Sequence, residues 1–182
     1  RTPMTAIIGY SDLLLSHLHD PDDREIASTI QRNGNSLLEL INDILDLSRI
    51  EAGHFEIECV RFSLHELVEE VYSLMAVRAQ EAKISFSLHY TSQLPTTIES
   101  DPKRLRQILV NLIGNAIKFT ATGGVRLQVG MRPPKLSKSP PLPCSSSLDS
   151  PSIYFEVIDT GIGIDDAQLL RLFQPFTQAD GS

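Results

Sequence analysis

The sequence has 182 residues, enough for one medium-sized domain or two small ones. It is 41% hydrophobic, so it can bury a core, and its net charge of −7 argues against binding to nucleic acid or an anionic membrane surface. No apolar run in the sequence approaches the ~20 residues that span a bilayer. Cys59 and Cys144 lie in no Cys-x-x-Cys pair, which indicates neither a zinc site nor a disulfide framework and fits a reducing cytoplasm.

The first third of the sequence predicts two helices. Apolar residues recur at helical spacing over residues 3–19, and an Asp- and Pro-rich break separates them from a longer helix at about 24–51. Asp22 or Asp23 is expected to cap this second helix. Its apolar residues form a seam close to a heptad repeat, made by Ile26, Ile30, Leu37, Ile41, Ile44 and Leu47 or Ser48.

Such a hairpin needs a partner. Two antiparallel amphipathic helices bury too little apolar surface to fold alone, whereas two copies make a four-helix bundle. We therefore expect residues 1–51 to form one protomer's half of a dimeric bundle, and Gly53 to end it in a left-handed conformation. A monomeric hairpin packed on the next domain is the alternative.

The following stretch mixes strands and a helix. Alternating side chains predict strands at 55–60, at 84–90 and around Ile98. Ser63, with Glu66 three residues later, has the pattern of a capping box and predicts a helix to about residue 82. The expected inward residues of this helix are Leu64, Leu67, Val68, Val71, Leu74 and Met75.

Asp101 and Pro102 signal the start of a helix that reaches about Thr120. At about 100° per residue, one face is an apolar stripe. This stripe consists of Leu105, Ile108, Leu109, Leu112 and Ala116. Asn111, Asn115 and Lys118 fall within about 60° of each other on another face. From this helix alone, that face can be a binding surface or an ordinary solvated surface.

The remainder continues the strand pattern around one insertion. A Gly-Gly turn at 123–124 precedes a strand at 125–129, and residues 132–152 are rich in Pro, Ser and Lys. We interpret 132–152 as a flexible insertion in a hairpin, with docking through its proline cluster as the alternative. Residues 153–158 are apolar except for one glutamate, as in a central strand.

A glycine-containing loop follows that strand. Asp159, Gly161 and Gly163 stand at its end, and Asp165 can cap a short helix to about Leu172. By itself, an Asp-Thr-Gly sequence also fits an ordinary strand-to-loop turn. The mixed order of elements predicts an α+β fold, a helical hairpin followed by a mixed sheet covered by helices on one face.

Two of these segments, about 40 residues apart, carry a specific resemblance. NLIGNAIKFT at 111–120 resembles the N box of sensor histidine kinases, and DTGIGI at 159–164 resembles their G1 box. Arg1-Thr2-Pro3 resembles the tail of their phosphoacceptor H box. The resemblance covers essentially the whole chain apart from the insertion. It implies a dimerisation and histidine-phosphotransfer domain at 1–53 and an ATP-binding catalytic domain at 54–182.

The resemblance implies an ATP site with Mg²⁺, to which the helix contributes four residues. Asn115 would be the direct Mg²⁺ ligand, and Asn111 would assist at the phosphates. Lys118 would contact the phosphates as a point charge. Phe119 would pack beside the base.

The loop would contribute three more ATP-binding residues. Asp159 would accept a hydrogen bond from the exocyclic amine of adenine, which favours ATP over GTP. Gly161 and Gly163 would leave room where the ligand approaches the backbone.

The same resemblance places two family elements outside the given sequence. The phosphoacceptor histidine would lie three residues before Arg1, and the second glycine-rich box would lie beyond Ser182. We therefore expect this fragment to be inactive alone. Thr2 falls one helical turn after the acceptor position, where relatives help to orient water for dephosphorylation of the partner regulator.

The implied function is an ATP-dependent protein-histidine kinase of a two-component system. The intact protein would autophosphorylate a histidine and pass the phosphoryl group to an aspartate of a response-regulator receiver domain. A cytoplasmic homodimer without nucleic-acid or direct membrane contact is expected, whether or not the parent protein is membrane-anchored.

Two alternatives belong to other classes. Gyrase-, chaperone- and mismatch-repair-type ATPases carry a glutamate base where this chain has Asn111, and they lack the helical hairpin. A non-enzymatic dimeric signalling scaffold with a vestigial nucleotide site is the other alternative, and the intact set of polar site residues argues against it.

Overall fold

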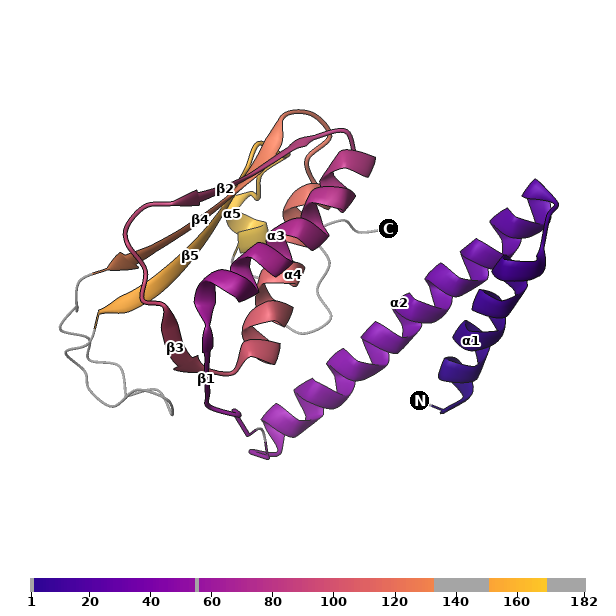
Figure 1. Cartoon of the computed structure of the whole chain (residues 1–182), viewed down its shortest axis with the longest axis horizontal. Coiled ribbons are helices and arrows are strands. Elements are labelled where there is room, and N and C mark those ends of the chain that lie inside the picture. The colour runs from indigo at the N-terminus through magenta and orange to yellow at the C-terminus, as the bar shows by residue number, and fades with distance from the viewer. Residues whose placement is uncertain (1, 55, 133–150, 170–182) are drawn as a thin grey trace. The chain divides into compact units, whose positions relative to one another are not determined.

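The chain folds into two compact units, residues 1–56 and 57–182, in a computed structural model that describes residues 2–54, 56–132 and 151–169 (Figure 1). The first unit contains two helices, α1 (Thr2–His17) and α2 (Pro21–Glu51). Within the described ranges, the second contains the sheets and three further helices. No helix within the described ranges is both long and apolar enough to cross a membrane.

The bend between α1 and α2 is fixed by local hydrogen bonds. Asp20 caps α2, because its Oδ1 accepts from the backbone N–H groups of Asp22 and Asp23 at 2.9 and 3.3 Å. The prediction that one of those two residues is the cap was therefore wrong, and α2 begins three residues earlier than expected. Pro21 takes the first helical position, where its missing N–H costs no hydrogen bond.

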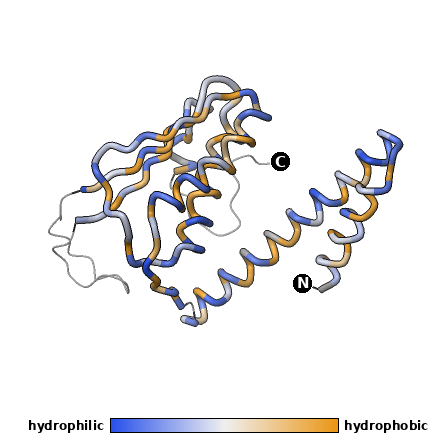
Figure 2. Tube along the Cα trace, in the orientation of Figure 1, coloured by the Kyte–Doolittle hydropathy of each residue, from blue (hydrophilic) through white to orange (hydrophobic). Residues whose placement is uncertain are grey.

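The helical unit has almost no closed core. Gly34 lets α1 and α2 approach, since a Cβ there would lie 3.1 Å from Ile8 Cγ1. Ala27 is the one hydrophobic residue that is fully buried in the described part of this unit. Large apolar side chains remain exposed along both helices. They include Ile7, Leu14, Ile26, Ile30, Leu37, Leu40 and Ile44. The orange stretches of α2 in Figure 2 mark its hydrophobic residues.

The second unit has a small sheet and a larger mixed sheet. β1 (Val60–Ser63) pairs antiparallel with β3 (Thr97–Ser100). β2 (Ser85–Tyr90) pairs parallel with β4 (Gly124–Arg132), and β4 pairs antiparallel with β5 (Ser152–Asp159). The mixed sheet predicted from the sequence is confirmed. Among the described strands, however, β4 is the central one, and β5, predicted to be central, lies at one side.

Helices α3 (Leu64–Glu81) and α4 (Pro102–Lys118) lie on one face of the larger sheet (Figure 1). Their inner faces and the inward residues of β4 form the core. Its largest fully buried members are Leu64, Val68, Val71, Met75, Leu109, Ile113, Leu127 and Val129. The prediction that Leu74 points inward was wrong, because Leu74 is 47% exposed.

The first predicted strand is displaced along the chain. The described residues between 56 and 59 form no strand, and β1 begins at Val60 because the backbone of β3 pairs with residues 60–63.

Cys59 is disulfide-bonded, so the expectation of no disulfide is wrong for it; the other half of that bond lies outside the described residues. The insertion connects Arg132 to Ser152, which pair across β4 and β5 as expected for a hairpin. Its flexibility, predicted for 132–152, concerns mainly residues 133–150, outside the described ranges.

A short helix, α5 (Asp166–Leu169), follows the glycine-containing loop. Asp165 caps it as predicted: Asp165 Oδ1 accepts from the N–H of Gln168 at 2.6 Å. Gln168 Oε1 accepts in return from the N–H of Asp165 at 3.1 Å, which completes a capping box. The predicted end at Leu172 lies outside the described residues.

Candidate functional site

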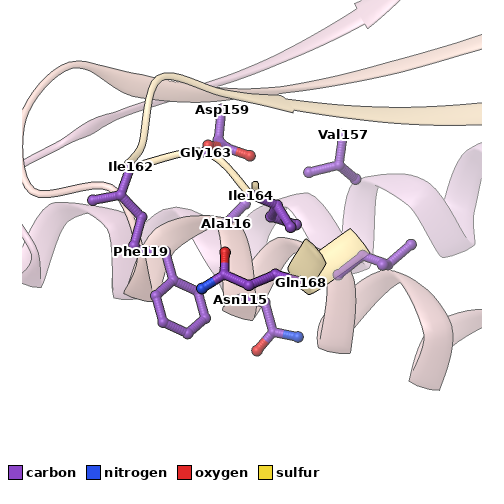
Figure 3. A pocket seen from close by; sticks show the side chains of 10 residues that line it. Asn115, Ala116, Phe119, Val157, Asp159, Ile162, Gly163, Ile164 and Gln168 are labelled. Carbon is purple, nitrogen blue, oxygen red and sulfur yellow. The ribbon is translucent and has the colours of Figure 1, made fainter. Parts of the chain in front are cut away.

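A cavity of about 290 Å³ opens between α4, the end of β5 and the loop that leads to α5 (Figure 3). Most of its lining is apolar. The lining residues are Leu112, Asn115, Ala116, Phe119, Val157, Asp159, Ile162, Gly163, Ile164 and Gln168. Apolar walls with a few polar groups are typical of a site for a small organic ligand.

Asp159 supplies the carboxylate of this cavity. It is the last residue of β5 and lies opposite Val125 of β4, so the edge of the sheet sets its backbone position. Asp159 Oδ1 accepts a hydrogen bond from the N–H of Gly161 at 2.9 Å, which orients the carboxylate. Figure 3 shows Asp159 on one side of the cavity and Asn115 and Phe119 of α4 on the other.

Helix α4 is held in place at its N-terminus by Asp101. This side chain is only 6% exposed, and its Oδ1 accepts from the backbone N–H groups of Lys103 and Arg104 at 3.0 and 3.1 Å. Its Oδ2 accepts from the N–H of Glu58 at 3.2 Å. Burial acts to raise the pKa of Asp101, but these hydrogen bonds, that of Arg104 first, outweigh burial and bring the pKa below its usual 3.8.

The loop after Asp159 rests on the C-terminal end of α4. The N–H of Ile162 donates to the carbonyl oxygen of Phe119 at 3.3 Å. A Cβ at Gly161 would lie 2.4 Å from that same oxygen, so only glycine fits this approach. This close contact with the Phe119 backbone is a structural reason for glycine at position 161, and the sequence alone did not reveal it. Gly163 has a φ of +72°, a conformation that glycine adopts most easily.

Of the seven predicted ATP-binding residues, four line the cavity: Asn115, Phe119, Asp159 and Gly163. Asn111 is exposed one turn before Asn115 on α4. Lys118 is also exposed, and its Nζ lies 5.0 Å from the centre of the Phe119 ring. Thr2 is the first residue of α1, in the other unit.

The sequence interpretation missed several cavity residues. Leu112 was assigned to the buried stripe of α4, but it is 51% exposed and lines the cavity, and Ile108 one turn earlier is 55% exposed. The buried face of α4 instead contains Leu109, Ile113, Ala116 and Ile117. Ile162, Ile164 and Gln168 were also missed. The available signal for the two isoleucines was that an apolar residue follows each of the two loop glycines.

The described residues contain no group of three or more His, Cys, Asp or Glu side chains that could hold a metal ion. Mg²⁺ commonly binds through one or two protein oxygens beside phosphate groups. The carboxamide of Asn115 is the candidate protein ligand inside the cavity.

Family comparison assigns both units. Residues 100–182 match the model described as "Histidine kinase-, DNA gyrase B-, and HSP90-like ATPase", which includes every cavity residue. Residues 1–53 match the model of the "His Kinase A (phospho-acceptor) domain". The chain therefore carries an ATPase-type domain behind a phosphoacceptor-type helical domain, and it is homologous to histidine kinases.

Individual relatives agree with this assignment. The chain is 38% identical over its whole length to "Signal transduction histidine-protein kinase BarA" of Escherichia coli, of which it covers 18%. It is 35% identical over 99% of its length to "Sensory/regulatory protein RpfC" of Xanthomonas campestris, of which it covers 23%. The chain thus spans about a fifth of the length of these relatives.

Solved structures show the same arrangement of elements. The structure described as full-length ShkA in complex with AMPPNP matches with a TM-score of 0.72 and 33% identity, over all of this chain and 35% of the other. The histidine kinase AdeS of Acinetobacter baumannii matches with a TM-score of 0.60 and 26% identity, over 98% of this chain and 79% of the other.

Proposed function

We propose that the chain binds ATP with Mg²⁺ in the cavity between α4 and β5, as the catalytic part of a protein-histidine kinase. The protein that contains it would transfer the γ-phosphoryl group of ATP to a histidine and then to an aspartate of a response regulator. The observation that carries the proposal is a carboxylate, Asp159, at the wall of an apolar cavity opposite Asn115. The bound AMPPNP of the ShkA structure supports ATP as the ligand class.

The chemistry of Asp159 favours adenine. An ionised carboxylate only accepts hydrogen bonds, and adenine presents an exocyclic amine that donates. Guanine presents a carbonyl at the equivalent position, which would set two acceptors against each other. Phe119 and Val157 line the same cavity and can pack against the faces of a base.

Helix α4 provides the groups for the phosphates. Asn115 would give one oxygen to Mg²⁺, which supplies charge neutralisation at the phosphates when it is bound. Asn111 and Lys118 lie exposed on the same helix and would contact the phosphates as hydrogen-bond donors. Positioning and charge neutralisation provide most of the catalysis in phosphoryl transfer, so this role of α4 is to hold the nucleotide in place.

The helical unit would mediate dimerisation and bind the partner protein. Its match to a phosphoacceptor domain and its exposed apolar seam support a homodimeric four-helix bundle to which a response-regulator receiver domain docks. In this bundle Thr2 would assist dephosphorylation of the regulator. We assign residues 1–53 to this domain and 54–182 to the catalytic domain, and we place both in the cytoplasm.

Titration calorimetry with ATP and GTP, with Mg²⁺ and with a chelator, tests the site. Asp159→Asn should weaken ATP binding by about 10- to 100-fold, the loss expected for a hydrogen bond to a charged group. Asn115→Ala should abolish the increment in affinity that Mg²⁺ provides and leave Mg²⁺-free binding nearly unchanged.

Glu156→Gln is the matched control, because it removes a carboxylate three residues earlier on β5, on the opposite face of the strand. It should bind ATP like the unmodified chain. Equal weakening by Asp159→Asn and Glu156→Gln would contradict the base assignment. Equal weakening by Asn115→Ala with and without Mg²⁺ would contradict the metal assignment.

A further inference from the structure

The hydroxyl group of Thr160 has several backbone partners. Thr160 stands between Asp159 and Gly161 in the sequence. Thr160 Oγ1 accepts from the N–H of Gly124 at 3.0 Å and donates to the carbonyl oxygen of Thr122 at 3.2 Å. The backbone N–H of Thr160 donates to the carbonyl oxygen of Gly124 at 3.2 Å. The side chain and backbone of one residue thus hold the turn between α4 and β4.

The turn itself is shaped around this hydroxyl. Gly123 has a φ of +103°, and a Cβ there would lie 2.2 Å from Thr160 Oγ1. The carbonyl oxygen of Gly123 accepts from the N–H and the hydroxyl of Ser85 at 3.0 and 3.2 Å, which ties the same turn to β2. The hydroxyl of Thr160 therefore contacts a turn that the neighbouring strand already fixes.

Two hydrogen-bonded connections link the loop that follows β5 to residues that follow α4. One connection joins Thr160 to Thr122, in the turn that follows α4, and to Gly124, the first residue of β4. The other joins the N–H of Ile162 to the carbonyl oxygen of Phe119, the C-cap residue of α4. In the sequence, Asp159 directly precedes Thr160, where the first connection starts, and Gly161 lies between Thr160 and Ile162. Losing the hydroxyl would leave one connection to set the distance between the Asp159 carboxylate and α4.

We propose that Thr160 is a positioning residue of the nucleotide site, whose hydroxyl fixes the Asp159 carboxylate relative to α4 and thereby determines the preference for adenine. Thr160 does not line the cavity, so it acts through Asp159 and not on the ligand. The inference deepens the proposed function and rests on it for its ligand. The positioning of Asp159 by the Thr160 hydroxyl can be tested on the chain without any nucleotide.

Thr91 offers a matched control at the other end of the same sheet. Its hydroxyl also makes two contacts, with the carbonyl oxygen of Val129 at 3.4 Å and with the Tyr154 hydroxyl at 2.7 Å. Val129 follows Gly124 by five residues of β4, or about 17 Å along a strand. Thr91→Val therefore removes a similar pair of sheet contacts well away from those that Thr160 makes with Thr122 and Gly124.

The first experiment needs no nucleotide. Amide hydrogen exchange, followed by NMR, compares the unmodified chain with Thr160→Val, Thr160→Ser and Thr91→Val. Thr160→Val should speed exchange at Gly124, Gly161 and Ile162 by about 3- to 10-fold, since one intramolecular hydrogen bond is lost. Thr160→Ser keeps the hydroxyl and should exchange like threonine. Thr91→Val should leave these three amides unchanged. Unchanged exchange in Thr160→Val would overturn the proposal.

The second experiment measures the dissociation constants of ATP and GTP for the same variants. Thr160→Val should weaken ATP binding by about 3- to 10-fold while changing GTP binding less, so the ATP preference shrinks. Thr160→Ser should restore both values, and Thr91→Val should change neither. An unchanged ATP-to-GTP ratio in Thr160→Val, or an equal loss in Thr91→Val, would overturn the positioning role. Failure of the unmodified chain to prefer ATP would instead refute the proposed function, and with it the adenine part of this inference.

Discussion

The two units of this chain bury their apolar residues in opposite ways. In the second unit, α3, α4 and β4 enclose a core with many fully buried side chains. In the first, the described parts of α1 and α2 leave most of their large apolar residues exposed and the rest only half-buried. The two units contain similar kinds of residue, so composition does not explain the contrast. Two helices can cover only one side of each other, whereas helices on a sheet close a core from two sides.

This contrast teaches where each unit obtains its stability. Apolar burial is the main favourable contribution to folding, at about 25 cal/mol per Å². The second unit has that burial within one chain. The first lacks it, and an exposed seam along two helices is the form in which bundle helices meet a second copy.

The largest expected effect follows from this difference. Ile30→Glu, on the exposed seam of α2, should prevent association and unfold the hairpin at micromolar concentration, while the second unit stays folded. Thr29→Glu introduces the same charge at the neighbouring exposed position and should be tolerated. Sedimentation equilibrium and circular dichroism measure both properties. A well-folded monomeric hairpin in the unmodified chain at high micromolar concentration would refute the dimer.

Sequence reasoning succeeded where the causes are local. The caps Ser63, Asp101 and Asp165 were predicted because each acts on backbone groups two or three residues away. The positions of α3 and α4 followed from these caps and from the apolar period. The error at Asp20 is instructive, because the prediction chose the wrong member of a run of acidic residues.

Sequence reasoning failed where the partner is distant. The strand expected at 55–60 forms at Val60–Ser63, because β3, almost 40 residues later, determines the register. The contact that requires glycine at position 161 is with the carbonyl oxygen of Phe119, which no local pattern reveals. The function of Leu112 was missed for a similar reason. A helical period locates an apolar face, but it does not show which part faces the core and which part faces a cavity.

Two leucines on α4 sharpen the distinction between core and cavity. Leu109 is fully buried and Leu112 is half-exposed, although they lie three residues apart. Leu109→Ala should destabilise the second unit by about 2–5 kcal/mol, because it leaves a cavity in a packed core. Leu112→Ala should cost less than about 1 kcal/mol but weaken nucleotide binding, because Leu112 lines the ligand cavity.

Urea unfolding and ATP titration of the two variants separate these effects. The expected pattern is a large change in stability for Leu109→Ala and a change mainly in affinity for Leu112→Ala. Equal destabilisation by both substitutions would show that Leu112 belongs to the core, as the sequence first suggested.

The smallest predicted effect concerns Asp101, which anchors α4 at the end away from the cavity. Removing an N-cap side chain typically costs about 0.5–2 kcal/mol, and Asp101→Ala should fall in this range at neutral pH. Asp101→Asn keeps an acceptor but loses the charge, so it should cost less. The two variants thus distinguish the hydrogen bonds to Lys103, Arg104 and Glu58 from the charge that strengthens them.

The stabilising effect of the Asp101 carboxylate should depend on pH in a definite direction. The pKa of Asp101 is lowered in the folded chain, so its ionised form stabilises the fold at pH values above the usual 3.8, and this contribution is lost as the pH falls through the lowered pKa. The stability gap between the unmodified chain and Asp101→Asn should therefore be constant near neutral pH and shrink below about pH 4. Thermal melting from neutral to acidic pH measures that gap, with Asp101→Ala as the reference for complete loss of the cap. A gap that widened on acidification would mean that the carboxylate is protonated more readily in the folded chain, and the charged cap would then not be what holds α4.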